Sequence, residues 1–283
     1  MSDPIDSAHL AGWIGAEEVA SDDLTPALAE RFHATLGLPG DPPRDGQAAA
    51  RLIHFCLCQP AAPMTALGED GHPARGGFLP PVPLPRRMWA GSDIAFDGDL
   101  RVGDAVRRVS RIADVAVKQG RSGTLCFVTV DHRIESGDAI VVRDRQTIVY
   151  RALENAVPAT PPAPAPLGAA VVSLAPTAPL LFRYSALTFN GHRIHYDHPY
   201  ATQVEGYPGL VVHGPLQATL LLHLASRKRA GRPPSRFSFR SLSTLFGDEL
   251  MCLHAGKLTG DTMELWTARP QGPVAMQAQA HWA

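Results

Sequence analysis

A run of leucines on every side of one predicted helix limits the folds that this chain can adopt. Residues 214–225 read GPLQATLLLHLA, with a proline where the first turn of a helix accepts one. The leucines fall on nearly every face, and a helix that is apolar all round has to be enclosed by other structure. Basic residues follow at 227–229, where they suit the negative pole of the helix dipole. The sequence therefore predicts a buried helix that the rest of its domain wraps.

Two similar units of β structure indicate what wraps this helix. Each unit starts with a Gly-Asp pair, at 103–104 and at 247–248, and continues as three β-rich runs separated by Gly-containing turns. The runs are 106–118, 124–134 and 139–151 in the first unit and 250–257, 262–267 and 274–282 in the second. An antiparallel meander that embraces one helix is the hot-dog arrangement, so the repeat predicts an α+β, double hot-dog fold. In the first unit, we expect the helix at 48–57.

A proline- and alanine-rich stretch divides the chain. Residues 153–168 contain five prolines, a composition that favours extended polyproline II geometry and serves as a spacer. The 283 residues are enough for two domains of about 140 residues each. We therefore expect an N-terminal half over 1–152, a linker over 153–168 and a C-terminal half over 169–283. Several prolines between 60 and 85 interrupt the first half. We interpret it as a degenerate half that supports a catalytic second half.

Composition excludes several classes of partner. The chain has 26 Lys and Arg against 27 Asp and Glu, so no global positive field attracts nucleic acid. Its four cysteines show no C-x-x-C spacing and lie in apolar or strand-like runs, which indicates reduced, buried thiols and a cytoplasmic protein. No apolar run approaches the ~18 residues of a membrane span, and the first residues do not resemble a signal peptide. We therefore expect neither a nucleic-acid nor a membrane partner, and a homodimer is a possible assembly.

Two motifs upstream of the predicted helix concentrate the polar chemistry. Residues 182–197 read FRYSALTFNGHRIHYD, and residues 207–215 read YPGLVVHGP. They resemble the motif of the MaoC-like hydratases, in which an Asp, a His five residues later and a His-Gly pair occupy the positions of Asn190, His195 and His213-Gly214. The longer wording is similar to the type 2 hydroxyacyl-thioester dehydratases, closest to two-domain enzymes of the mesaconyl-C4-CoA hydratase type. Residues 77–91 are similar to the N-terminal half of the same enzymes.

The matched residues suit the addition of water to an enoyl thioester. An imidazole such as His195 exchanges protons near neutral pH, as a reversible hydration requires. The free N–H groups at a helix start can hold the enolate-like oxygen, and Gly214 has no side chain to block the thioester. Asn190 replaces the acidic residue of the motif. An amide cannot take up a proton, so we assign the acid and base work to His195 and the positioning of water to Asn190.

Each of these residues also has a purely structural interpretation. His195 could be a core histidine, and Asn190 could cap a helix or turn. The histidines at 192, 195 and 198 recur every third residue, but no acidic residue completes a metal shell with them, so we expect no metal and no cofactor besides the CoA of the substrate. His213 is expected to order its loop beside the substrate.

Arginines bear on the choice of substrate. Arg193 could pair with a distal carboxylate of the acyl group, or be structural. Arg86, Arg87 and Trp89 are expected to line the acyl or pantetheine channel. The basic cluster that includes Arg227 and Arg229 could hold the CoA phosphates, although such a cluster is more often a solvated helix end.

The sequence thus predicts a hydro-lyase that adds or removes water across the α,β bond of an acyl-CoA thioester. The resemblance favours mesaconyl-C4-CoA and citramalyl-CoA, or another 3-hydroxyacyl thioester, as substrates. Two alternatives stay open at this point. One is a hot-dog acyl-CoA thioesterase, and the other is a non-catalytic subunit that binds acyl-CoA.

Overall fold

The computed structural model describes residues 5–120, 123–152 and 162–282. Its strands are β1 (Glu17–Asp23), β2 (Arg86–Phe96), β3 (Ala105–Gly120), β4 (Gly123–Ser136), β5 (Ala139–Arg151), β6 (Ala170–Leu174), β7 (Arg236–Ser241), β8 (Met251–Thr259), β9 (Thr262–Ala268) and β10 (Val274–His281). Its helices are α1 (Ser7–Ala11), α2 (Pro26–Leu36), α3 (Ala178–Leu187) and α4 (Gly214–Lys228), with short turns η1 (Ile53–Cys56), η2 (Met64–Ala66), η3 (Arg193–His195) and η4 (Tyr200–Val204). The six predicted β runs are confirmed as β3, β4, β5, β8, β9 and β10.

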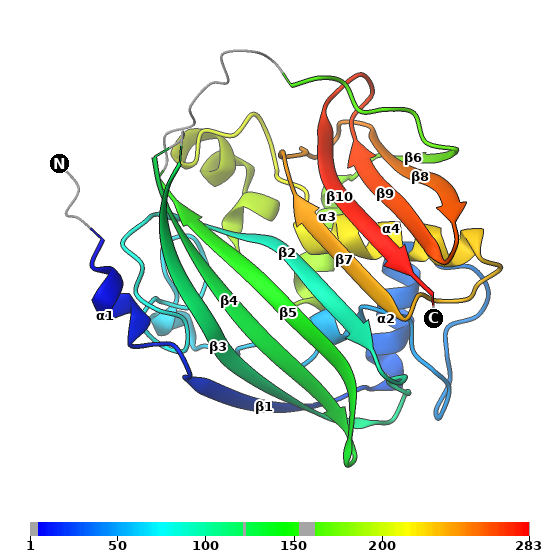
Figure 1. The fold of residues 1–283 in the computed structure, drawn as a ribbon, viewed down its shortest axis with the longest axis horizontal. Helices are drawn as coiled ribbons and strands as arrows, with labels where there is room; N and C mark the ends of the chain where they lie inside the picture. The colour runs from blue at the N-terminus through cyan, green and yellow to red at the C-terminus, as the bar shows by residue number, and fades with distance from the viewer. Residues whose placement is uncertain (1–4, 121–122, 153–161, 283) are drawn as a thin grey trace.

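The strands form one continuous antiparallel sheet in the order β1-β3-β4-β5-β2-β7-β10-β9-β8-β6. The first five belong to the first half of the chain, and the pairing of β2 with β7 joins the halves (Figure 1). Gly91 lies at this junction, opposite Arg240. A Cβ atom on Gly91 would lie 2.3 Å from the carbonyl oxygen of Phe239, so only glycine allows the two strands to approach this closely. The two meanders thus make the predicted double hot-dog fold.

Helix α4 is the wrapped helix that the leucine run predicts. It contacts β2 and β7–β10, and helices α2, α3 and α4 lie on the same side of the sheet (Figure 1). Its leucines at 216, 220, 221, 222 and 224 are all buried. Burial of a leucine side chain stabilises a fold by about 1.5–3 kcal/mol, so these residues fix the helix against the sheet.

The prediction of a helix at 48–57 was wrong. Ala49 N–H donates to the Leu100 carbonyl at 2.8 Å, and Leu52 and Cys58 take left-handed backbone angles (φ 69° and 55°), which leaves room only for the single turn η1. The longer helix of this half is α2, where the Thr25 side chain accepts from Leu28 N–H at 3.1 Å and caps the first turn. The face of β3–β5 therefore lines an open cavity.

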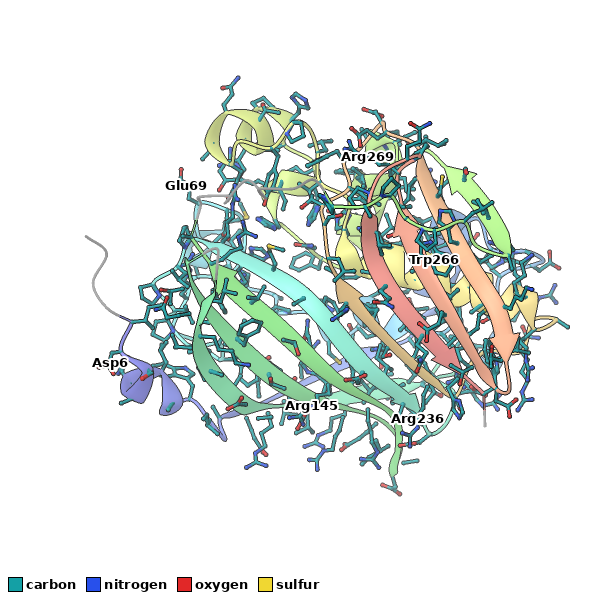
Figure 2. All side chains as sticks on the ribbon, turned by 45° about the horizontal axis from the view of Figure 1, so that its top comes forward. Asp6, Glu69, Arg145, Arg236, Trp266 and Arg269 are labelled. Carbon is teal, nitrogen blue, oxygen red and sulfur yellow. The ribbon has the colours of Figure 1, made fainter. Side chains whose placement is uncertain are left out.

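The turns and the linker agree with the sequence in part. Gly103 has φ 96° as expected, whereas in the second Gly-Asp pair Asp248 takes the left-handed angle (φ 65°). Of the linker predicted at 153–168, residues 153–161 lie outside the described residues. The rest is docked on the second half, because Trp266 on β9, which is labelled in Figure 2, donates through Nε1 to the Pro166 carbonyl at 3.0 Å.

Candidate active site

The loop that follows α3 carries the first motif and is held by the end of that helix. Thr188 Oγ1 donates to the Tyr184 carbonyl at 2.8 Å, and Asn190 N–H donates to the Ser185 carbonyl at 2.8 Å. Phe189 between them takes a left-handed φ of 47°, which reverses the chain. This local geometry turns Asn190 and the short helix η3 towards the start of α4.

A cavity of about 1170 Å³ lies where this loop meets the face of β2–β5. Both halves of the chain line it. Of the predicted site residues it brings together Asn190, Arg193, His195, His213, Gly214, Arg87 and Trp89. It is large enough for an acyl chain with part of a carrier.

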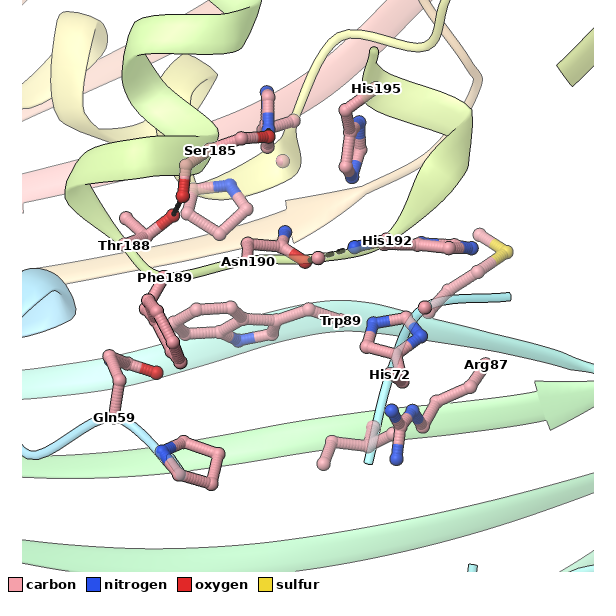
Figure 3. Close-up of a pocket in the computed structure, with 18 of the residues that line it drawn as sticks. Gln59, His72, Arg87, Trp89, Ser185, Thr188, Phe189, Asn190, His192 and His195 are labelled. Atoms are coloured by element: carbon pink, nitrogen blue, oxygen red, sulfur yellow. Dashed lines mark hydrogen bonds between the residues drawn. The ribbon is translucent and has the colours of Figure 1, made fainter. Parts of the chain in front are cut away.

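His195 is buried, with 7% of its surface exposed, and it borders this cavity. Its Nδ1 lies 2.7 Å from the carbonyl oxygen of Val211, which can only accept a hydrogen bond, so Nδ1 carries the proton of the neutral ring. Burial lowers the pKa of His195 to about 4, although the Val211 hydrogen bond opposes the shift. The ring is therefore neutral at pH 7, and its Nε2 is free to accept a proton (Figure 3).

His213 is the residue just before α4, and its ring stacks on His195 with 3.7 Å between centroids and 17° between planes. Ser185 Oγ lies 2.8 Å from its Nε2, and burial lowers its pKa well below the usual value. Two positive charges would repel each other strongly at this distance, so His195 and His213 cannot both be protonated easily. The stack therefore holds the His195 ring in place and favours its neutral form.

The Asn190 side chain both closes a turn and borders the cavity. Its Oδ1 accepts from His192 N–H at 3.0 Å, which closes a tight turn. Its amide nitrogen stays on the cavity side, facing the region of His195 (Figure 3). It can therefore donate a hydrogen bond to a water or hydroxyl.

Gly214 opens α4 at the wall of the cavity. A Cβ atom there would lie 3.4 Å from Ser241 Oγ and 3.8 Å from both Met276 and the Trp89 carbonyl oxygen, which are ordinary van der Waals distances, so the packing around the helix start does not itself require glycine. The first N–H groups of a helix have no intrahelical acceptor and carry the positive end of its dipole. An oxyanion placed here would be stabilised.

Two of the predicted arginines are engaged in structural pairs. Arg193 donates through Nε and Nη2 to one oxygen of Asp197, at 2.9 and 2.8 Å, and stacks over Tyr200. Arg86 is buried against Glu205, with its Nε 3.2 Å from Oε2, and it does not line the cavity. Trp89 donates to Gly91 and packs on Phe55, so it forms a fixed wall.

Arg227 and Arg229 do not reach the site. They lie at the far end of α4, which at about 1.5 Å per residue is roughly 20 Å from Gly214. Arg229 lies 3.4 Å from Asp261 and over the Trp282 ring. Neither arginine lines the cavity that the described residues form.

The sequence analysis missed Asp70 and His72, which the first half supplies. His72 Nδ1 lies 2.9 Å from Asp70 Oδ2, and the His72 ring is 4.2 Å from that of His192. The pKa of Asp70 is lowered: burial raises it, and hydrogen bonds from His72 overcome that effect. Ligand atoms of these three residues lie within 4.8 Å of one another, a geometry that could also hold a metal ion. The only sequence signal is the Asp-x-His spacing.

Comparison with known proteins identifies the class. A MaoC-like dehydratase from Phytophthora capsici superposes with a TM-score of 0.70 at 14% identity, covering 98% of both chains. A Mycobacterium tuberculosis protein described as a double hotdog fold superposes with a TM-score of 0.55 at 13% identity, covering 95% of this chain and 96% of that one. The protein is a double hot-dog protein.

The family follows from the sequence. The model of the family "Hydroxyacyl-thioester dehydratase type 2" matches residues 50–247. The mesaconyl-C(4)-CoA hydratase of Chloroflexus aurantiacus is 45% identical over 274 residues, which cover 96% of this chain and 97% of that protein. The chain belongs to the hydroxyacyl-thioester dehydratase type 2 family, and it is a hydro-lyase of acyl thioesters. No helix among the described residues is long and apolar enough to cross a membrane.

Proposed function

We propose that this enzyme adds water to the α,β double bond of a short dicarboxylic enoyl-CoA such as mesaconyl-C4-CoA, and removes it from citramalyl-CoA. The observation that carries the proposal is the neutral His195 ring, whose Nδ1–H is fixed on Val211 while Nε2 borders the cavity beside the start of α4. The 45% identical relative, a mesaconyl-C(4)-CoA hydratase, supports this choice of substrate.

The reaction uses one base and one oxyanion site. The thioester oxygen lies against the N–H groups at Gly214, and the Asn190 amide holds water at the β-carbon. His195 Nε2 takes a proton from this water as its oxygen bonds to the β-carbon, and the electrons of the double bond move to the thioester oxygen. The same Nε2–H then protonates the α-carbon, which restores the thioester and the neutral ring.

Several further features belong to the proposal. Residues 169–283 supply the base, the amide and the helix, while the first half supplies the opposite wall. No cofactor takes part, so dialysis against a chelator should leave the rate unchanged, despite the metal-like spacing of Asp70, His72 and His192. Four buried free cysteines support a cytoplasmic setting. Gel filtration tests the possible homodimer.

The test is a panel of enoyl-CoA esters, with and without a second carboxylate, followed at the ultraviolet band of the enoyl thioester. His195→Ala should lower kcat by about 10²–10⁴-fold, the range that a general base contributes. His198→Ala is the matched control, because His198 is exposed and does not line the cavity. A thiol reagent added to the same reactions detects free CoA. Release of CoA without loss of the double bond, or full activity of His195→Ala, would contradict the proposal.

A further inference from the structure

Among the described residues, four arginines line the cavity: Arg87, Arg108, Arg151 and Arg193. Arg193 is paired with Asp197, Arg108 lies 3.9 Å from Glu18, and Arg151 has an interaction of its own. Arg87 is different, because none of the described carboxylates lies within ion-pair distance of it. A partly buried guanidinium without a counterion is costly, so its place in a ligand pocket needs an explanation.

The residue opposite Arg87 is Tyr150, on the neighbouring strand β5. Its side chain is fully buried and does not line the cavity. Burial raises the pKa of Tyr150, and the charge of Arg87 and its approach to the hydroxyl partly offset that shift, so the two groups are close. Tyr150 can therefore position the guanidinium, and Arg87 is the member of the pair that borders the cavity.

This part of the cavity lies next to the proposed chemistry. Figure 3 shows His72 between His192 and Arg87. The ring of His72 is 4.2 Å from that of His192, which is 5.4 Å from that of His195. Arg87 and the proposed base therefore border the same cavity, with the His72 and His192 rings between them.

We infer that Arg87, positioned by Tyr150, forms the subsite for the second carboxylate of the acyl group. This rests on the proposed function and deepens it, since the carboxylate of mesaconyl-C4-CoA is attached to the β-carbon that receives water. The planar guanidinium can donate two parallel hydrogen bonds to this carboxylate.

The subsite transfers to Arg87 the carboxylate-binding role that the sequence analysis considered for Arg193. Arg193 is held by Asp197 and by the Glu69 carbonyl at 3.1 Å, so it stabilises the catalytic loop. Arg87 holds the substrate's acid group. Anchoring this group next to the β-carbon would fix the double bond against His195 and reject esters that end in a methyl group.

The experiment compares mesaconyl-C4-CoA with crotonyl-CoA as substrates, and succinyl-CoA with butyryl-CoA as competitive inhibitors. Arg87→Gln should lower kcat/KM for mesaconyl-C4-CoA about 100-fold and weaken inhibition by succinyl-CoA, while crotonyl-CoA and butyryl-CoA change less than threefold. Arg87→Lys keeps the charge but loses the fork, so about tenfold is expected. Arg133→Gln, an exposed arginine on β4, is the control.

Tyr150→Phe keeps the test decisive if Arg87→Gln does not fold. It removes the hydroxyl beside Arg87, so the preference for the dicarboxylic ester should fall, by less than in Arg87→Gln, while turnover of crotonyl-CoA stays unchanged. If the wild type prefers dicarboxylic esters and the Arg87 and Tyr150 variants keep that preference, the subsite is wrong and the function stands. If the wild type shows no preference, both the substrate and the subsite are wrong.

Discussion

The close contact between Gly71 and Gly191 offers a graded test of how the first half supports the catalytic loop. Gly71 has φ 84°, and a Cβ atom on it would lie 2.0 Å from the Gly191 carbonyl oxygen. Since an ordinary contact begins at 3.4 Å, Gly71→Ala has to separate the two loops by about 1.4 Å. In Gly191→Ala the new Cβ lies 2.6 Å from the Gly71 oxygen, so a shift of about 0.8 Å is enough.

These shifts translate into activity because Arg193 N–H donates to the Asp70 carbonyl at 2.9 Å, which couples the loops directly. A displacement of about 1 Å in an active site can reduce the rate about 100-fold. We expect kcat/KM to fall about 100-fold or more in Gly71→Ala and about tenfold in Gly191→Ala. The left-handed angle adds about 1–2 kcal/mol of strain in Gly71→Ala alone.

The assay is initial-rate hydration at the enoyl band, with thermal unfolding measured on the same samples. Gly77→Ala is the control, since a Cβ there meets no atom within 4 Å. If Gly71→Ala folds and keeps kcat/KM within twofold of wild type, the loop of Asp70 and His72 does not position the site.

Other expectations concern protons and buried polar groups. Because burial lowers the pKa of His195 to about 4, kcat/KM should stay level from pH 8 to about 5 and fall only below that; a midpoint near 6.5 in the pH profile would contradict the assignment. The pKa of buried His223 is also lowered to about 4. In the unfolded chain each of these histidines has a pKa of about 6.5 and binds a proton below that pH, whereas in the folded protein it stays neutral down to about pH 4. The free energy of unfolding should therefore be highest above pH 6.5 and fall by about 3 kcal/mol per histidine on reaching pH 4. Urea titrations at several pH values measure this loss. Thr267 Oγ1 donates to Gln217 Oε1 at 2.7 Å inside the core. Thr267→Val should therefore destabilise the protein by about 1–3 kcal/mol in the same titrations, and Thr267→Ser much less.

The sequence predicted those strands and helices whose formation depends mainly on local residue patterns. The meander strands and α4 follow from alternation and from an apolar run, and their observed bounds differ from the expected ones by a few residues. The helix at 48–57 failed because its apolar residues pack as a loop with two left-handed positions. Tertiary contacts override the pattern there, and no periodicity reveals them.

The site residues also fall into a group that the sequence could predict and a group that it could not. Asn190, His195, His213 and Gly214 belong to two motifs that are close together in the sequence, so the sequence could group them, and the structure brings them to one cavity. Asp70 and His72 reach it only because a distant loop docks through the glycine contact. Nor could the sequence tell a paired arginine from an unpaired one, since that depends on Asp197 lying beside Arg193.

The two related units belong to one chain and join through the pairing of β2 with β7, so a substitution in one unit is not repeated in the other. When identical subunits associate about a twofold axis, every substitution is made in both copies. Here one copy keeps the enclosed helix and its motif, while the other presents an open sheet face to the cavity. Substitutions on β2–β5 can therefore change the shape of the cavity without altering the catalytic residues around α4. Substrate specificity can thus change through the first half while the second half conserves the reaction.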